Sequence, residues 1–176
     1  MVNNLLKEKV RNVPDFPKKG IVFRDITTLL KDAQAFRAAV DLFIEKYKDK
    51  KIQKVVGIES RGYILGAALA YRLNAGFVPI RKPGKLPAET LREEYKLEYG
   101  TDAVEIHKDS INNGERILIH DDLLATGGTI NAACKLVESL GGNIIGVSFL
   151  IELAFLNGRK LLNNYEIHSL ITYDKE

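Results

Sequence analysis

The stretch Ile117 to Ile130, ILIHDDLLATGGTI, sets the expectations for both fold and site. It begins with an apolar run, places Asp121 and Asp122 side by side, and continues into the small residues of Ala125 to Thr129. In open α/β sheets, ligands bind beyond the carboxyl ends of the strands. We therefore expect a buried strand that ends at His120, with the two acids at its carboxyl end and a ligand-binding turn just beyond.

The turn has the composition of a phosphate site. It leads into an apolar-patterned helix, and unpaired N–H groups and the dipole at a helix N-terminus favour an anion. Two glycines let the anion approach the backbone closely, and two threonines add hydroxyl donors. The five candidate phosphate-binding residues are Ala125, Thr126, Gly127, Gly128 and Thr129.

The adjacent acids Asp121 and Asp122 would repel a phosphate, so they are assigned a different partner. Carboxylates accept hydrogen bonds from hydroxyl groups, and they also suit a hydrated Mg²⁺ ion. A ribose that carries a 5′-phosphate offers hydroxyls and an anion at about this separation. The chain lacks G-x-x-x-x-G-K-[ST] and lacks G-x-G-x-x-G after its first strand, which sets aside a P-loop and a dinucleotide site.

Apolar runs alternate with helical patterns along the chain. We expect strands at Lys54–Ile58, Phe77–Arg81, Ile117–His120, Ile144–Ile151 and Ile167–Tyr173. We expect helices at Tyr63–Leu73, at Ile130–Leu140 ending at Gly141 and Gly142, and after a capping Asp32 with Phe36, Val40, Phe43 and Tyr47 on one face. The segment Val13–Thr27 is rich in proline and glycine and is expected to be loop. This alternation predicts a single α/β domain over residues 1–176, with a mostly parallel twisted sheet and helices on both faces.

One long excursion, from about Gly84 to Asp109, departs from this pattern. Its charged and apolar residues alternate on both sides of a predicted turn at Gly100–Asp102, which indicates an antiparallel, flexible flap. Long excursions from a compact domain are often lids, and a surface hairpin without a role is the plainer alternative.

Bulk composition restricts the class of protein. The 176 residues are 45% hydrophobic and 28% charged, and 26 basic against 23 acidic side chains give a net charge of +3, too balanced to indicate a nucleic-acid partner. The single cysteine, Cys134, lies in an apolar helical pattern and is expected to be a packed thiol. We find no secretory leader and no apolar run of membrane-spanning length, so we expect a cytoplasmic protein with no membrane partner.

With these motifs in hand, a family resemblance is evident. ILIHDDLLATGGT resembles the ribose-phosphate signature of the type I phosphoribosyltransferases. Four more segments, PDFPKKGIVFRDIT, GIESRGYILG, PIRKPGKLP and KLEYGTDAVEIHKD, are similar in order and spacing to the branch of that family that acts on adenine. The resemblance covers about Val13 to Leu156. It departs at His120, where the family's strand usually has an apolar residue.

The resemblance implies a reaction and its partners. Such enzymes transfer the 5-phosphoribosyl group of 5-phosphoribosyl-1-pyrophosphate to adenine, giving AMP and pyrophosphate. They use Mg²⁺, for which we expect no firm direct protein ligand because the substrate holds most of it. They are commonly homodimers, with Arg61 and Arg81 near the subunit contact.

The resemblance also implies residue roles. Ala125 to Thr129 hold the 5′-phosphate, Asp121 and Asp122 take the ribose hydroxyls, and pyrophosphate is bound by Ser60, Arg61, Arg81, Lys82 and Lys85. Adenine is bound by Phe23, by backbone groups of Val22 and Arg24, and by Leu153. Glu98 takes the proton of the purine, and Tyr99 helps to close the site. The loop Glu59–Gly62 often contains a cis peptide in such proteins.

Plainer interpretations stay open for some of these residues. Arg81, Lys82 and Lys85 suit a solvated basic patch, Arg24 and Asp25 suit a structural ion pair, and Phe23 suits a core position. For the whole chain, the alternatives are the same reaction on hypoxanthine, guanine or xanthine, a regulator that senses the sugar pyrophosphate, and a ribose-phosphate binder without catalysis. Because we find no helix-turn-helix, the regulator is disfavoured.

Overall fold

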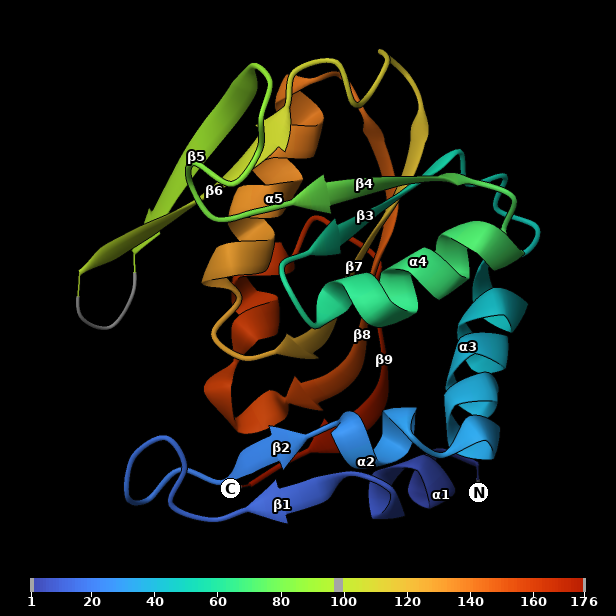
Figure 1. Ribbon diagram of the computed structural model, residues 1–176, viewed down its shortest axis with the longest axis vertical. Helices are drawn as coiled ribbons and strands as arrows, with labels where there is room; N and C mark the ends of the chain where they lie inside the picture. Colours follow the sequence, from blue (N-terminus) through green and yellow to red (C-terminus); the bar gives the residue numbers. More distant parts are fainter. Residues whose placement is uncertain (1, 97–99, 176) are drawn as a thin grey trace.

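A five-stranded parallel sheet forms the centre of the molecule (Figure 1). The structure is a computed structural model that describes residues 2–96 and 100–175. The strand order is β4-β3-β7-β8-β9, and the strands are β3 (Lys54–Ile58), β4 (Gly76–Ile80), β7 (Arg116–Leu124), β8 (Asn143–Leu153) and β9 (Ile167–Tyr173). All four strand pairings are parallel, as the sequence predicts.

Helices cover both faces of this sheet and bury its alternating side chains. The helices are α3 (Ala33–Tyr47) and α4 (Gly62–Arg72) on one face and α5 (Gly128–Ser139) on the other (Figure 1). Within β7, Leu118 belongs to the core under α3 and α4, whereas Ile117 and Ile119 belong to the core under α5. Successive residues of a strand point to opposite faces, so a continuous apolar run fills two cores at once.

The structure confirms the residues predicted to cap the start of α3 and to follow the end of α5. The Asp32 side chain accepts hydrogen bonds from the backbone N–H groups of Gln34 and Ala35, both at 3.1 Å, and so caps α3. Gly141 follows α5 with a φ of +81°, a left-handed conformation that favours glycine. The buried Cys134 packs inside α5, as expected of a structural thiol.

Strand β7 is longer than predicted, and this changes the position of the acid pair. Pairing with β8 continues through Asp121 to Leu124, so both acids lie inside the strand and not beyond its end. Pairing with β3, however, stops at His120. From Asp121 onward, β7 is therefore paired with β8 only.

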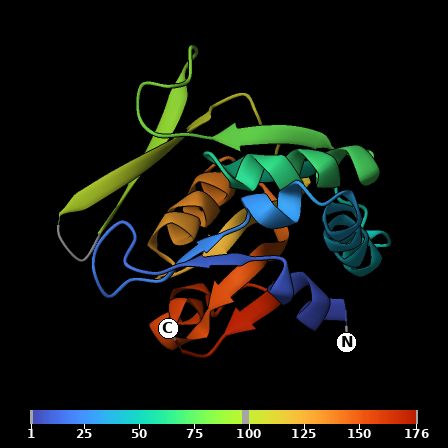
Figure 2. The same cartoon turned by 60° about the horizontal axis from the view of Figure 1, so that its bottom comes forward.

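The predicted flap is an antiparallel hairpin that projects from the body of the molecule (Figures 1 and 2). Its strands are β5 (Thr90–Lys96) and β6 (Thr101–His107). The predicted turn at Gly100–Asp102 is wrong in its bounds, because Thr101 pairs with Lys96 and Asp102 with Tyr95.

The predicted loop at Val13–Thr27 is wrong in part. The N-terminal region contains α1 (Val2–Glu8), β1 (Arg11–Val13), β2 (Phe23–Asp25) and α2 (Thr27–Leu30), and β1 pairs with β2 in an antiparallel ribbon. Strands of three residues are too short to show an alternating pattern, which is why sequence periodicity missed them. Figure 2 shows this ribbon beside the C-terminal end of the chain.

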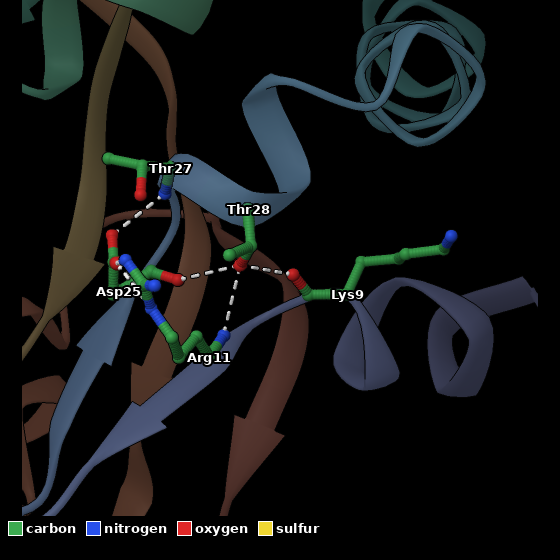
Figure 3. Close-up of polar contacts among 5 residues, drawn as sticks. All are labelled: Lys9, Arg11, Asp25, Thr27 and Thr28. Carbon is green, nitrogen blue, oxygen red and sulfur yellow. Dashed lines mark hydrogen bonds and ion pairs between the residues drawn. The ribbon is translucent and has the colours of Figure 1, made fainter.

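A polar cluster fixes the junction of β1, β2 and α2 (Figure 3). The Asp25 carboxylate accepts hydrogen bonds from the backbone N–H of Thr27 at 2.9 Å and from Nε of Arg11 at 3.0 Å. Hydrogen bonds from Thr27 and then from Arg11 lower the pKa of Asp25 to about 2. The Thr28 hydroxyl donates to the Lys9 carbonyl at 2.7 Å. Asp25 therefore pairs with Arg11, and the alternative ion pair with Arg24 is wrong.

Among the described residues, no helix has both the length and the apolar character needed to cross a bilayer.

His120, the departure from the family pattern, is fully buried in β7. Its Nδ1 lies 2.9 Å from the Ser148 hydroxyl on β8, and the Phe43 ring packs edge-on against it. Its Nε2 has no hydrogen-bond partner among the described residues. Burial lowers the pKa of His120 to about 3, so the imidazole is neutral in the folded protein at pH values where an exposed histidine is charged.

This burial predicts a pH-dependent loss of stability. Below the ordinary histidine pKa of 6.5, the unfolded chain binds a proton at His120 that the folded chain does not, down to about pH 3. Between pH 7 and pH 5 the free energy of unfolding should fall by about 2 kcal/mol more in the wild type than in His120→Val. Urea unfolding at the two pH values measures this difference, and equal losses in the two proteins would contradict the prediction.

Candidate active site

A cavity of about 350 Å³ opens at the carboxyl ends of β3, β4 and β7. Because parallel strands end at the same edge of a sheet, segments distant in sequence meet here. The polar residues that line this cavity, here called the basic cavity, are Glu59, Ser60, Arg61, Arg81, Lys82, Asp121, Asp122 and Thr129. Four of the five predicted pyrophosphate residues thus lie together with both predicted ribose acids. Lys85 does not line the cavity, although its carbonyl accepts a hydrogen bond from Arg81 at 3.1 Å.

A smaller cavity of about 80 Å³ adjoins the basic cavity. Its lining contains all five predicted phosphate residues, Ala125 to Thr129, and it shares Asp121, Leu123 and Thr129 with the basic cavity. We call it the phosphate-loop cavity. Gly127 precedes α5 with a φ of +87°, so the turn uses the conformational freedom that its glycine supplies.

The acid pair is held at the junction of the two cavities. Asp122 is buried, and its Oδ2 lies 3.0 Å from Nε of Arg61 in an ion pair whose geometry falls outside that of a hydrogen bond. Burial and then the neighbouring Asp122 raise the pKa of Asp121 well above its ordinary value. Burial also raises the pKa of Asp122, and the Arg61 charge opposes that rise. Burial and mutual repulsion therefore destabilise the ionised form of the acid pair. When ionised, the pair is a strong acceptor for any group that can donate hydrogen bonds to it.

The loop after β3 reaches the acid pair because it contains Gly62. A Cβ atom at Gly62 would lie 2.8 Å from Oδ1 of Asp121 and 3.1 Å from its Cα, so any larger residue would push α4 away from β7. The peptide between Glu59 and Ser60 is cis, as expected for this loop. Sequence analysis did not single out Gly62, although its place directly after Arg61 was a usable signal.

Each cation that lines the basic cavity is already paired with a carboxylate. Arg61 pairs with Asp122, and Arg81 pairs with Glu59 through contacts of 2.9 and 3.2 Å. Lys82 pairs with Asp102 of the flap. The solvated-patch alternative for these cations is therefore wrong for Arg81 and Lys82, which are partly buried and paired.

Two of these acids were missed by sequence analysis. The Arg81 side chain, through its hydrogen bonds, lowers the pKa of Glu59, and the hydrogen bond from Lys82 lowers the pKa of Asp102. Glu59 is the first residue of the predicted loop Glu59–Gly62, but no role was assigned to its side chain. Asp102 is separated from Lys82 by twenty residues, and only the folding of the flap onto the sheet brings the two together.

The predicted base-binding segment lies beside this edge. Phe23 of β2 is partly buried, with the Arg61 guanidinium carbon 5.0 Å from its ring centroid and the Phe16 ring edge-on at 5.2 Å. It is therefore not the plain core residue of the alternative interpretation. Leu153, the last residue of β8, is also partly buried. The predicted residues Glu98 and Tyr99 lie outside the residues that the structure describes.

The predicted phosphate loop, Ala125 to Thr129, is in close backbone contact with Gly158. A Cβ atom on Gly127 would lie 2.6 Å from the Gly158 carbonyl oxygen, and one on Gly158 would lie 2.3 Å from the Ala125 carbonyl oxygen. Gly158 begins the short helix η2 (Gly158–Leu162), which follows η1 (Ala154–Leu156). The segment after β8 therefore fixes the loop, although no motif singled out from the sequence lies there.

Comparison with known proteins identifies relatives of this chain. The family model described as a phosphoribosyl transferase domain matches residues 25–169. An adenine phosphoribosyltransferase of Geobacter metallireducens is 59% identical over 168 residues, which are 96% of this chain and 98% of that protein.

Solved structures agree in fold. The adenine phosphoribosyltransferase of Thermoanaerobacter pseudethanolicus superposes with a TM-score of 0.94 at 56% identity, covering 97% of this chain and 99% of that one. The enzyme of Saccharomyces cerevisiae, complexed with an imino-altritol bisphosphate and adenine, superposes with a TM-score of 0.92 at 40% identity, covering 97% and 98%.

The contact between Gly127 and Gly158 predicts a specific cost of substitution. Gly127→Ala should lower the free energy of unfolding by about 2–4 kcal/mol, because it combines a positive φ with a backbone clash. Gly114→Ala is a matched control, since Gly114 has a φ of +80° but nothing within 4 Å of its added Cβ. It should cost only about 1 kcal/mol. Urea unfolding measures both, and equal costs would show that the contact with Gly158 is unimportant.

Proposed function

This chain belongs to the phosphoribosyltransferase family, and on that premise we propose that it transfers the 5-phosphoribosyl group of 5-phosphoribosyl-1-pyrophosphate to adenine, releasing AMP and pyrophosphate. The observation that carries the proposal is the junction of two cavities at the acid pair. The phosphate-loop cavity and the basic cavity share Asp121 in their linings. The substrate has a matching arrangement: a 5′-phosphate at one end of the ribose, hydroxyl groups in the middle and a pyrophosphate at the other end.

The phosphate loop, Ala125 to Thr129, binds the 5′-phosphate of the sugar. Its glycine turn lies at the N-terminus of α5, where the backbone N–H groups and the helix dipole attract an anion. Asp121 and Asp122 accept hydrogen bonds from the 2′- and 3′-hydroxyls. The raised pKa values of the pair support this role, because neutral donors restore the solvation that burial removes without adding charge.

The basic cavity binds the pyrophosphate through Ser60, Arg61, Arg81 and Lys82, with Lys85 adding charge nearby. Because the three cations that line the cavity are already paired, binding proceeds by exchange of partners. Pyrophosphate oxygens compete with carboxylates for guanidinium groups, and planar guanidinium groups bind phosphate oxygens at two points.

The carboxylates of the site suit a hydrated Mg²⁺ bound mainly by the substrate. No group of three or more potential metal ligands occurs among the described residues, so a cage built from the protein alone is not supported. Mg²⁺ usually keeps several waters and binds through one or two carboxylates together with phosphate oxygens. Asp121 and Asp122 are the carboxylates that would hold such an ion, and Glu59, the third carboxylate in the lining, is already paired with Arg81. When bound, the ion neutralises charge on the pyrophosphate leaving group.

Adenine binds between Phe23 and Leu153, with backbone groups of Val22 and Arg24 contacting the edge of the ring. The position of Phe23 beside Arg61 supports this, because a base that packs on Phe23 adjoins the pyrophosphate loop. In the reaction the bond from C1′ to the pyrophosphate oxygen breaks, and a bond from C1′ to N9 of adenine forms. The N9 proton must leave, which requires a base.

Glu98 on the flap is the proposed base, and Tyr99 is proposed to help exclude water. The described ends of the hairpin lie beside the phosphate loop, with Tyr95 Cδ2 3.2 Å from the position that a Cβ on Gly128 would occupy. The other flap acids have partners of their own: Glu93 bonds Lys135, Glu94 bonds Arg92, and Glu105 accepts from the Gly84 N–H. Exclusion of water protects the oxocarbenium-like transition state.

A homodimer is also proposed, with α4 at the contact. Ile64, Ala67 and Tyr71 lie on one exposed face of this helix, and Ile64 and Tyr71 are 45% and 84% exposed. The face is continuous with Arg61, which precedes α4 in the pyrophosphate loop. A second copy that covers α4 would therefore also shield the edge of the site.

A reducing cytosolic compartment is proposed as the location. The only cysteine is the buried Cys134, and burial raises the pKa of its thiol to about 12. Such a thiol forms no disulfide within the chain and is poorly reactive.

The proposed reaction is tested by pyrophosphate release. With phosphoribosyl pyrophosphate and Mg²⁺ present, adenine should stimulate release strongly, and hypoxanthine, guanine and xanthine should not. If one of the other bases stimulates release and adenine does not, the chain is a phosphoribosyltransferase with a different base specificity. No stimulation by any base would refute the transferase activity.

Substitution of the proposed base has a sharp expected outcome. Glu98→Gln should lower kcat by about 100-fold or more, the usual contribution of a general base, with KM values changed only a few-fold. Glu94→Gln is the matched control, because Glu94 lies on the same flap and bonds an exposed arginine. An unchanged kcat in Glu98→Gln would remove Glu98 from the mechanism.

The dimer is tested by sedimentation. The wild type should sediment at twice the chain mass of 19.7 kDa, and Tyr71→Glu should shift it toward the monomer because it buries a charge in an apolar contact. Leu161→Glu, at another exposed apolar residue, should leave the mass unchanged. A wild type that sediments as a monomer at working concentration contradicts the proposal.

A further inference from the structure

The residues of β2 divide between two sides of the ribbon. Successive side chains of a strand point in opposite directions. Phe23 lies beside Arg61 at the edge of the basic cavity, whereas the Arg24 side chain is buried against Tyr173 at the end of β9. The backbone of β2 is thus held between the proposed base site and the end of the chain.

The Arg24 guanidinium lacks the partner that a buried charge normally has. Only 6% of Arg24 is exposed, and no described carboxylate lies within ion-pair distance of it, since Asp25 pairs with Arg11. Its Nη1 donates to the Asn12 side-chain oxygen at 2.6 Å, and its Nε is buried with no hydrogen-bond partner among the described residues. A buried cation needs compensation, and the one available is an aromatic face.

Tyr173 supplies that face. The guanidinium carbon of Arg24 lies 4.0 Å from the centroid of the Tyr173 ring, and Nζ of Lys7 lies 4.3 Å from the same centroid. Tyr173 is itself only 7% exposed, so the ring is fixed by its surroundings. Figure 1 shows the C-terminal end of the chain beside β2, in agreement with these contacts.

The same ring is the neighbour of the second proposed base-contacting residue. Tyr173 and Leu153 are register partners on the adjacent parallel strands β9 and β8, and such partners share a face of the sheet. The ring therefore fixes the distance between β2 and the end of β8, which are the two sides of the adenine site. A ribbon of two three-residue strands is not stable by itself, so an anchor of this kind decides its position.

From this geometry we infer that Tyr173 is a positioning residue for adenine recognition, acting through the buried Arg24 guanidinium. The inference rests on the proposed function, because it concerns the base site of that reaction. Tyr173 holds Phe23 and the backbone of Val22 and Arg24 at the spacing that a purine needs from Leu153. Tyr173 lines neither the phosphate-loop cavity nor the basic cavity.

The test compares the two substrates in steady-state kinetics of the full-length protein. Tyr173→Leu keeps apolar volume but removes the aromatic face, so KM for adenine should rise about tenfold while KM for phosphoribosyl pyrophosphate stays within about twofold. Tyr173→Phe retains the face and should restore the wild-type KM for adenine. Lys7→Met removes the outer cation and its exposed 2.8 Å hydrogen bond to the Thr172 carbonyl but leaves the contact between Arg24 and Tyr173, so both KM values should stay unchanged.

The outcomes separate positioning from general destabilisation. Asn12→Ala removes the other Arg24 contact, so it should raise the KM for adenine selectively, and it serves as the test if Tyr173→Leu does not fold. An unchanged adenine KM, or equal rises in both KM values with a lowered Tm, would overturn the inference. If the wild type releases no pyrophosphate with adenine, the proposed function is wrong. If the wild type is active but the variants have its KM for adenine, only the inference about Tyr173 is wrong.

Discussion

The burial of Asp121 and Asp122 side by side is the constraint on which the rest of the site depends. Two neighbouring carboxylates repel each other and lose hydration, so they need a cation close by. Arg61 supplies it, and Arg61 reaches the pair because Gly62 lets the start of α4 approach β7 closely. Pairing between β3 and β7 stops at His120, so β7 is paired only with β8 from Asp121 onward, and both acids line the basic cavity. The acid pair in β7 therefore fixes the position of the loop that follows β3.

Ion pairs with carboxylates hold the cations of the site in place before a ligand binds. Glu59 and Asp102 hold Arg81 and Lys82 in place, and the lowered pKa values of both acids reflect that pairing. Because a flap residue holds Lys82, the flap and the sheet edge are linked by the same charge that we propose binds pyrophosphate. An anion that takes Lys82 from Asp102 necessarily changes what holds the flap.

The C-terminal part of the chain supports both ends of the proposed substrate. Gly158 contacts the backbone of the proposed phosphate loop, and Tyr173 stacks on Arg24 of β2, the strand proposed to contact the base. Neither residue lies in the motifs that carried the resemblance, so neither was a candidate from the sequence. Their roles are in packing, which carries no characteristic local pattern of residues.

The sequence by itself determined the parallel sheet, the capped helix at Asp32, the flap and the glycine turn before α5. These follow from local rules, namely the period of apolar residues, the capping preferences and the need for glycine in a tight turn. The two-stranded N-terminal ribbon, the extension of β7 through the acid pair and the partners of each cation were decided only by the tertiary structure. Short strands carry too few residues to show a period. The pairing of Lys82 with Asp102, and of Arg24 with Tyr173, joins residues far apart in the chain, so it depends on packing between elements that no single segment encodes.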